Sequence, residues 1–206
     1  MKSLSEFEVN AIKDILNNGF TKAAETLSFF MNEKISIHAF DFKVDTVEHY
    51  KANFRFKEDS KYVLITEVIG EIRGFSYLVF SEADTAKLFE LTIPKDLPRS
   101  SNEFKVMSNA LLLELDNIVS ASVITQFSDL LDIRIHGGVP SIWDVHDSNK
   151  SVKEFFEGNL QDSHVLNFKS NFSSPSKKEE FSPEFIWILT PTFVEKVKET
   201  ILKNKG

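Results

Sequence analysis

The sequence predicts an α+β domain with pseudo-twofold symmetry, in which two α-β-β-β-α halves share one largely antiparallel sheet. Two observations lead to this fold class. A helical pattern near the start recurs at an offset of 100 residues, which aligns Leu16 with Asp116 and Ala23 with Val123. The order of helix-like and strand-like periodicities is the same in both copies. We therefore expect one domain over residues 1–206, with halves at about 1–93 and 100–206 and a linker at about 94–99.

The first half is predicted to begin with a long helix. Ser3 and Glu6 form a capping-box pattern, and the helical periodicity continues to about Met31. Branched and aromatic residues then predict three strands, at 35–42, 61–70 and 72–81. A helix at 82–91 closes this half, and Pro94 stops it.

The second half is predicted to repeat this order. Ser100 and Glu103 form its capping-box pattern, and its long helix continues to about Leu131. Its predicted strands lie at 132–138, 164–172 and 184–190, and its closing helix at 191–205. The segment at 140–163 is longer and more polar than its counterpart in the first half and is predicted to contain a short helix at about 152–156. Residues 173–180 are predicted to form a hairpin tip or a mobile loop.

Composition narrows the classes of function. The formal net charge is −7, and no basic stripe follows any predicted helix, which argues against nucleic-acid binding and favours a neutral or basic protein partner. Cysteine is absent, which excludes disulfides and thiolate metal sites. The amino terminus has no apolar signal core, and no later apolar run is predicted to span a bilayer. We expect a cytoplasmic protein that does not contact a membrane. The many phenylalanines are predicted to fill the core.

The two long helices each carry a carboxylate three residues before an asparagine. Rotation by about 100° per residue places Glu114 and Asn117 on the side of the second helix opposite its core side. The predicted core side consists of Leu111, Leu112, Leu115, Val119, Val123 and Phe127. The residues around the polar pair are mostly small or apolar: Met107, Ala110, Ile118, Ala121 and Thr125. Such a ring favours a docking surface. The equivalent face around Asp14 and Asn17 is more polar and looks less like one.

These residues carry a family resemblance. Glu114-Leu-Asp-Asn117, followed after 22 residues by Pro140, resembles the active-site signature of the CheC and CheX family of response-regulator phosphatases, a Glu-x-x-Asn with a distant proline. The segments ILNNGFTKAAETLS and LDNIVSASVITQF also resemble the paired helices of CheC, and the repeat covers nearly the whole chain, as it does in that family. Pro140 is expected to have a structural role.

The resemblance implies hydrolysis of the aspartyl phosphate on a CheY-like receiver domain. Asn117 would hold the attacking water, because a carboxamide offers both a donor and an acceptor without competing as a nucleophile. Glu114 would bind a cation of the receiver, most plausibly its lysine. The receiver itself would supply Mg²⁺, so the chain is expected to need no cofactor or metal of its own.

The sequence departs from the family pattern in both copies. The family usually has Asp or Ser four residues before the Glu, where this chain has Ala110 in the second copy and Asn10 in the first. The first copy also has Phe40 at the position of the proline, and Asp14 is shorter than Glu by one methylene. We therefore predict a working site at Glu114 and Asn117 and a degenerate second site at Asp14 and Asn17.

Several alternatives remain open at this stage. Glu114 and Asn117 could solvate the outer face of a core helix. The chain could be a non-catalytic binding module, like the FliM-type relatives in the flagellar switch, or an adaptor for a CheD-like deamidase. A CheC-like chain length and a single intact, CheX-like motif leave the subtype unsettled. Asp144, His146 and Asp147 could ligate a metal ion, but a turn is the favoured interpretation. Gly19 is expected to permit close helix packing.

Overall fold

The computed structural model describes residues 4–146 and 162–203 of the chain. Its helices are α1 (Glu6–Phe30), α2 (Val47–Asn53), α3 (Glu82–Thr92), α4 (Asn102–Leu131) and α6 (Thr192–Lys203). Its strands are β1 (Ser36–Thr46), β2 (Ser60–Gly70), β3 (Gly74–Ser81), β4 (Ile135–Gly137), β5 (Ser141–Asp144), β6 (His164–Ser174), β7 (Glu179–Phe181) and β8 (Glu184–Leu189). They form an eight-stranded sheet in the order β1-β6-β8-β3-β2-β4, with β5 paired to β2 and β7 to β6. All of these pairs are antiparallel, so the predicted fold class is confirmed.

The strand order has the symmetry that the repeat predicts. β3 and β8, one from each half, lie at the centre of the sheet, flanked by β2 and β6. Each outer strand pairs with a strand of the other half: β1 of the first half pairs with β6 of the second, and β4 of the second half pairs with β2 of the first. Each half therefore completes the sheet edge of the other.

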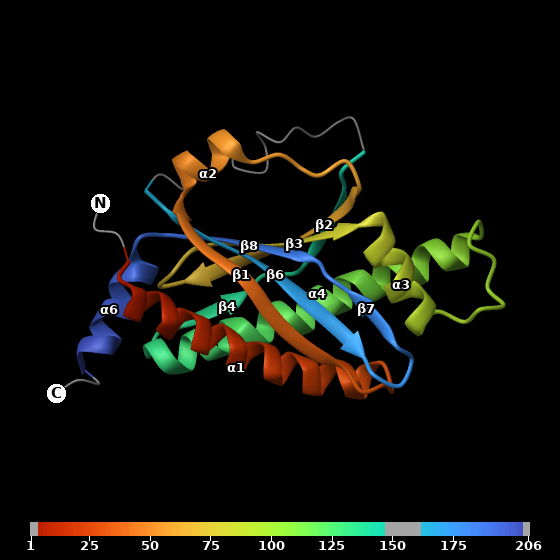
Figure 1. Cartoon of the computed structure of the whole chain (residues 1–206), viewed down its shortest axis with the longest axis horizontal. Helices are drawn as coiled ribbons and strands as arrows, with labels where there is room; N and C mark the ends of the chain where they lie inside the picture. The colour runs from red at the N-terminus through yellow and green to blue at the C-terminus, as the bar shows by residue number, and fades with distance from the viewer. Residues whose placement is uncertain (1–3, 147–161, 204–206) are drawn as a thin grey trace.

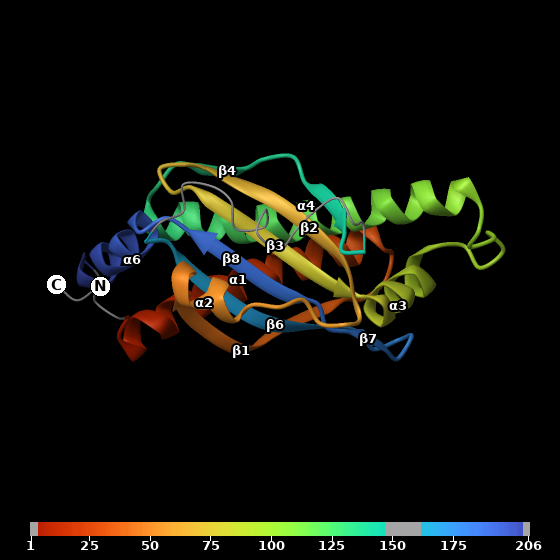
Figure 2. The same ribbon diagram turned by 90° about the horizontal axis from the view of Figure 1, so that it is seen from above.

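Helices cover the two faces of the sheet unequally. α1 and α4 lie along one face, with α6 and α3 near opposite ends of the sheet, whereas α2 lies over the other face (Figures 1 and 2). The main core fills the space between α1, α4 and the sheet and is rich in phenylalanine, as predicted; the rings of Phe168 and Phe185 stack 5.1 Å apart within it. A smaller apolar cluster under α2 includes Tyr77 and Trp143.

The long helices pack closely against each other where one of them has a glycine. A Cβ atom at Gly19 would lie 2.9 Å from the Cα atom of Val123, closer than real side chains approach a backbone. Gly19 therefore permits the contact between α1 and α4, as predicted. The six side chains predicted for the core side of α4 are all buried: Leu111, Leu112, Leu115, Val119, Val123 and Phe127.

Both long helices end where expected, but their caps differ from the prediction. α1 begins at Glu6 with Ser5 as its cap, because the Ser5 hydroxyl accepts the Glu8 N–H and the Glu8 carboxylate accepts the Ser5 N–H. Ser3 lies outside the described residues. The cap of α4 is Ser101, whose hydroxyl accepts a backbone N–H at 3.0 Å. A turn closed by the Ser101 N–H and the Pro98 carbonyl, 2.9 Å apart, sets this start and overrides the pattern at Ser100.

Three short elements were missed, and tertiary pairing creates two of them, β5 and β7. The Thr46 hydroxyl caps α2 directly after β1, and β5 and β7 are edge segments formed against β2 and β6. The predicted strand at 132–138 shrinks to β4, and the hairpin tip at 173–180 is confirmed between β6 and β7. The short helix expected at 152–156 lies outside the described residues.

The expectation that no apolar run could span a bilayer is wrong by length and composition alone. Among the described residues, α4, with 30 residues, is long and apolar enough to cross a membrane by these two measures. Half of its apolar 18-residue stretch is buried inside the fold, against α1 and the sheet. Burial in the core accounts for this apolarity, since the central helix of a folded domain has the same composition.

Candidate functional site

Glu114, Asn117 and Pro140 line one open groove. The groove runs between the outer side of α4 and the chain segment that joins β4 to β5, and its volume is about 590 Å³. Asn117 is exposed and Glu114 is half-buried. The full lining is Ile69, Ala110, Leu113, Glu114, Asn117, His136, Gly137, Gly138, Val139 and Pro140. The fold thus brings together the three residues that the sequence motif singles out.

The wall opposite α4 is a short loop held by the backbone. The Gly138 N–H donates to the Glu67 carbonyl at 2.8 Å, which fixes the loop to β2. At Gly137 a Cβ atom would come within 3.2 Å of the Ile124 side chain on α4, so a glycine lets the strand pass this close to the helix. Val139 is 94% exposed at the rim. The loop is therefore anchored at its base and accessible at its tip.

His136 is a groove residue that the sequence analysis did not select. It is exposed in the middle of β4, paired with Ile69 in the ladder to β2. Its sequence surroundings have no metal-ligand spacing. Its position four residues before the motif proline was the available signal, but only the pairing of β4 with β2 places it beside α4.

A second hollow adjoins the groove and is lined mostly by large apolar side chains. Glu114 and Ala110 line both, so the Glu114 carboxylate lies between the two recesses. The apolar hollow is lined by Phe30, Met31, Leu91, Thr92, Ile93, Met107, Ala110, Leu111 and Glu114. Phe30 and Met107 keep 47% and 42% of their surface exposed. The ring around the polar pair therefore extends into a larger apolar surface.

The first copy of the motif has a different environment. Asn17 lines a pocket of about 140 Å³ with Phe40, while Asp14 is exposed and is not part of its lining. β1 runs through this region with a register shift between Phe40 and Lys43, where the second copy has an open loop. The structure therefore does not bring Asp14 and Asn17 together in a groove like that of Glu114 and Asn117.

A buried carboxylate lies on the same turn of α4 but faces inward. Asp116 is fully buried, and its oxygens accept hydrogen bonds from the Thr66 hydroxyl at 2.6 Å and the Ser120 hydroxyl at 3.2 Å. Burial raises the pKa of Asp116 from 3.8 to about 6, and the two hydrogen bonds oppose this rise. The sequence analysis aligned Asp116 with Leu16 but gave it no role.

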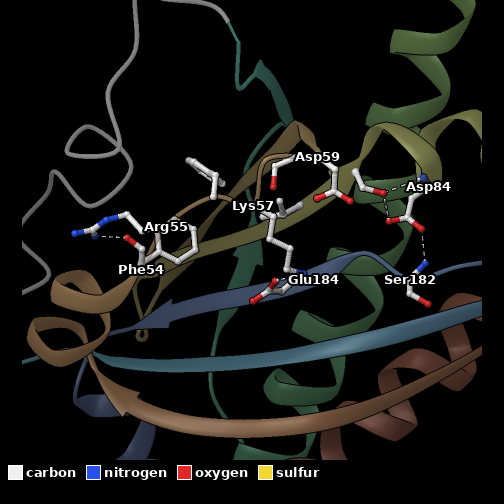
Figure 3. Close-up of a pocket in the computed structure, with 11 residues that line it drawn as sticks. Phe54, Arg55, Lys57, Asp59, Asp84, Ser182 and Glu184 are labelled. Carbon is white, nitrogen blue, oxygen red and sulfur yellow. Dashed lines mark hydrogen bonds and ion pairs between the residues drawn. The ribbon is translucent and has the colours of Figure 1, made fainter.

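Two other polar clusters have structural explanations. The Asp144 carboxylate accepts the His146 N–H at 3.0 Å, which is the hydrogen bond of a turn, and it also forms an ion pair with Lys61. Asp147 lies outside the described residues. The pocket in Figure 3 lies between the segment after α2 and the start of β8. There Lys57 pairs with Glu184 at 3.2 Å, and Asp84 accepts the Ser182 N–H at 2.8 Å. These charges hold neighbouring segments together.

Comparison with known proteins identifies the fold. No family model and no curated protein matches the sequence. Among solved structures, the chain is similar to Thermotoga maritima FliY, with 19% identity, a TM-score of 0.72, and coverage of 98% of this chain and 99% of that one. It is also similar to FliM from the H. pylori FliM–SpeE complex, with 10% identity, a TM-score of 0.65, and coverage of 97% and 99%. The chain therefore has the CheC-like fold that the sequence resemblance predicted.

A chemotaxis protein shares the fold at a greater structural distance. CheX from Desulfovibrio desulfuricans has 14% identity and a TM-score of 0.50, over 84% of this chain and 97% of that one. At these identities the likeness establishes the architecture, and the chemistry has to be argued from the groove itself.

Proposed function

We propose that the chain is a phosphatase that hydrolyses the aspartyl phosphate of a CheY-like response regulator. The observation that carries the proposal is the convergence of Glu114, Asn117 and Pro140 on one open groove. A solvated helix face would explain the polar pair alone. It does not explain why the proline, distant in sequence, belongs to the opposite wall of the same groove.

The proposed reaction is the attack of water on phosphorus. The bond from phosphorus to the receiver's aspartate oxygen breaks, which releases inorganic phosphate and a free carboxylate, and the protons of the water pass to phosphate and solvent. The receiver's Mg²⁺ and lysine neutralise the charge that develops on the phosphoryl group. The phosphatase has to align the water, and exposed Asn117 offers a carbonyl oxygen and an NH₂ group for that purpose.

Glu114 is proposed to set the register of docking. Its carboxylate is half-buried between the groove and the apolar hollow, where a salt bridge is screened less than on an open surface. A lysine of the receiver would pair with Glu114 while an apolar side chain beside it fills the hollow near Met107. A cytoplasmic location follows from such a partner. Ala110 contributes no polar group, so Glu114 and Asn117 act without the additional Asp or Ser of the family pattern.

The function is tested with a panel of CheY-like receivers from the same genome, each charged with acetyl phosphate. Phosphate loss is followed with the wild type, Asn117→Ala and the matched control Asn17→Ala. We expect one receiver to lose phosphate faster with the wild type and with Asn17→Ala, but not with Asn117→Ala. Equal rates for wild type and Asn117→Ala would overturn the mechanism.

A second candidate function is partner binding without catalysis. The FliM structures similar to this chain include complexes with SpeE and with FliG. FliY and FliM also give higher TM-scores than CheX does. If a receiver binds in the panel but none is dephosphorylated, Glu114 and the apolar hollow are better regarded as a binding surface.

A further inference from the structure

Four buried polar side chains connect α4 to the sheet: Asp116, Ser120, Thr66 and Ser76. Asp116 accepts from the Thr66 hydroxyl at 2.6 Å and from the Ser120 hydroxyl at 3.2 Å, and the hydroxyls of Ser120 and Ser76 are 3.3 Å apart. Each of these residues is at most 3% exposed. Thr66 belongs to β2 and Ser76 to β3, so the network joins the helix to two neighbouring strands.

The equivalent positions in the first helix are apolar. At the repeat offset of 100 residues, Asp116 corresponds to Leu16 and Ser120 to Phe20, and both of these are buried. The fold therefore accepts an apolar pair at this place on a long helix. A buried carboxylate has a desolvation cost that a leucine does not. The polar pair occurs in the copy that carries Glu114 and Asn117, which calls for an explanation beyond folding.

Thr66 lies beneath the loop that forms the far wall of the groove. β2 pairs with β4 from Val68 onward and with β5 up to Ile65, so Thr66 falls in the gap from which the loop leaves the sheet. Its neighbour Glu67 accepts the Gly138 N–H, and the Thr66 methyl group would lie 3.3 Å from a Cβ atom at Gly137. The hydrogen bond from Thr66 to Asp116 therefore links the base of this wall to the helix that forms the other wall.

We propose that Asp116 is a positioning residue that, through Thr66, sets the rotation of α4 and its distance from β2, and hence the gap between Asn117 and the loop at Pro140. A hydrogen bond to a carboxylate is directional and stronger than one between neutral groups. A rotation or sliding of α4 would break the hydrogen bond from Thr66 and leave the buried carboxylate with the Ser120 hydroxyl of its own helix alone, a loss that an apolar contact would not impose. The catalytic consequence of this inference rests on the proposed function, whereas its geometric content does not.

The test compares Asp116→Asn, Thr66→Val and Thr66→Ser. Thr66→Val removes the hydroxyl at nearly constant shape, and Thr66→Ser retains it. The substrate is the receiver that the wild type dephosphorylates. We expect Asp116→Asn and Thr66→Val to lower kcat by about 10- to 100-fold and to change KM by no more than about threefold. The reason is that Asn117 is displaced, whereas Glu114 still binds the receiver. Thr66→Ser is expected to keep the kcat of the wild type.

An independent readout follows the wall itself. NMR-detected hydrogen exchange of the Gly138 amide, which bonds to Glu67, is expected to accelerate in Asp116→Asn and Thr66→Val but not in Thr66→Ser. The amide of Phe168, in β6, is the control, because general loss of stability would accelerate both amides. Unchanged Gly138 exchange overturns the inference even if kcat falls, and an unchanged kcat overturns it as well. If the wild type acts on no receiver, the proposed function fails, and the exchange data alone decide the geometric role of Asp116.

Discussion

Replacement of Asp116 by asparagine should change how the stability of the protein depends on pH. The ordinary pKa of this carboxyl group is 3.8, and burial raises it to about 6 in the folded state. Between these values the folded protein binds a proton that the unfolded chain does not bind. The free energy of unfolding of the wild type therefore decreases as the pH rises from about 4 to about 6 and has no further contribution from Asp116 above that range. Asparagine does not titrate, so the variant lacks this contribution.

The size of the effect follows from the difference between the two pKa values. Each pH unit of difference corresponds to about 1.4 kcal/mol, which gives about 3 kcal/mol in total for Asp116. Asp116 is fully buried, so no correction for solvent screening applies. Most of this contribution falls between pH 4 and pH 7.5. The other titratable groups are shared by both proteins and cancel when their free energies are subtracted.

Urea unfolding at several pH values from 4 to 7.5 measures this quantity. The free energy of unfolding of the wild type minus that of Asp116→Asn should decrease by about 2–3 kcal/mol over the range, with its midpoint near pH 5. The matched control is Asp84→Asn, in a partly exposed carboxylate at the start of α3. A difference that is constant with pH would show that Asp116 titrates at its ordinary value, and would refute the buried network from which its positioning role was inferred.

Three further predictions concern the helix contact, the docking surface and the first motif copy. Gly19→Ala places a methyl group 2.9 Å from the Val123 backbone and should destabilise the protein by about 1–2 kcal/mol in urea unfolding, despite the better helix propensity of alanine; a gain in stability would contradict the close contact. Met107→Asp should raise KM for the receiver about tenfold or more with little change in kcat, whereas Val106→Asp, at an exposed position outside the hollow, should leave KM unchanged, and equal effects would argue against docking in the hollow. Asp14→Glu combined with Phe40→Pro should not create a second active site, because Asp14 does not line the pocket of Asn17; phosphatase activity of this variant in an Asn117→Ala background would disprove that.

Much of the fold follows from local patterns. The second long helix has an apolar stripe on the side predicted to be buried, and the six strands predicted from branched and aromatic residues are all present. These features are local, because periodicity and propensity depend on nearby residues. The edge strands β5 and β7 were missed, and the start of α4 was placed one residue early, because strand partners and a turn at Pro98 decide them. The short helix α2, capped by Thr46, was also missed.

The candidate site was only partly predictable for the same reason. The spacing of Glu114 and Asn117 fixes their common helix face, and the motif adds Pro140. Whether the proline faces that helix depends on the pairing of β4 and β5 with β2, which the sequence does not specify. The groove position of His136 and the apolar hollow beside Glu114 also arise from segments distant in the chain.

The sequence by itself determined the duplication, the CheC-like fold and the motif on the outer face of the second long helix. The tertiary structure alone decided that Asp116 is buried and that Thr66, 50 residues away, is its partner. It also decided that the two copies of the motif have different surroundings, a groove in one and a small pocket in the other. The physical reason is that periodicity records which side of a helix is buried, whereas a groove or a buried hydrogen bond depends on which strands the chain brings against that helix.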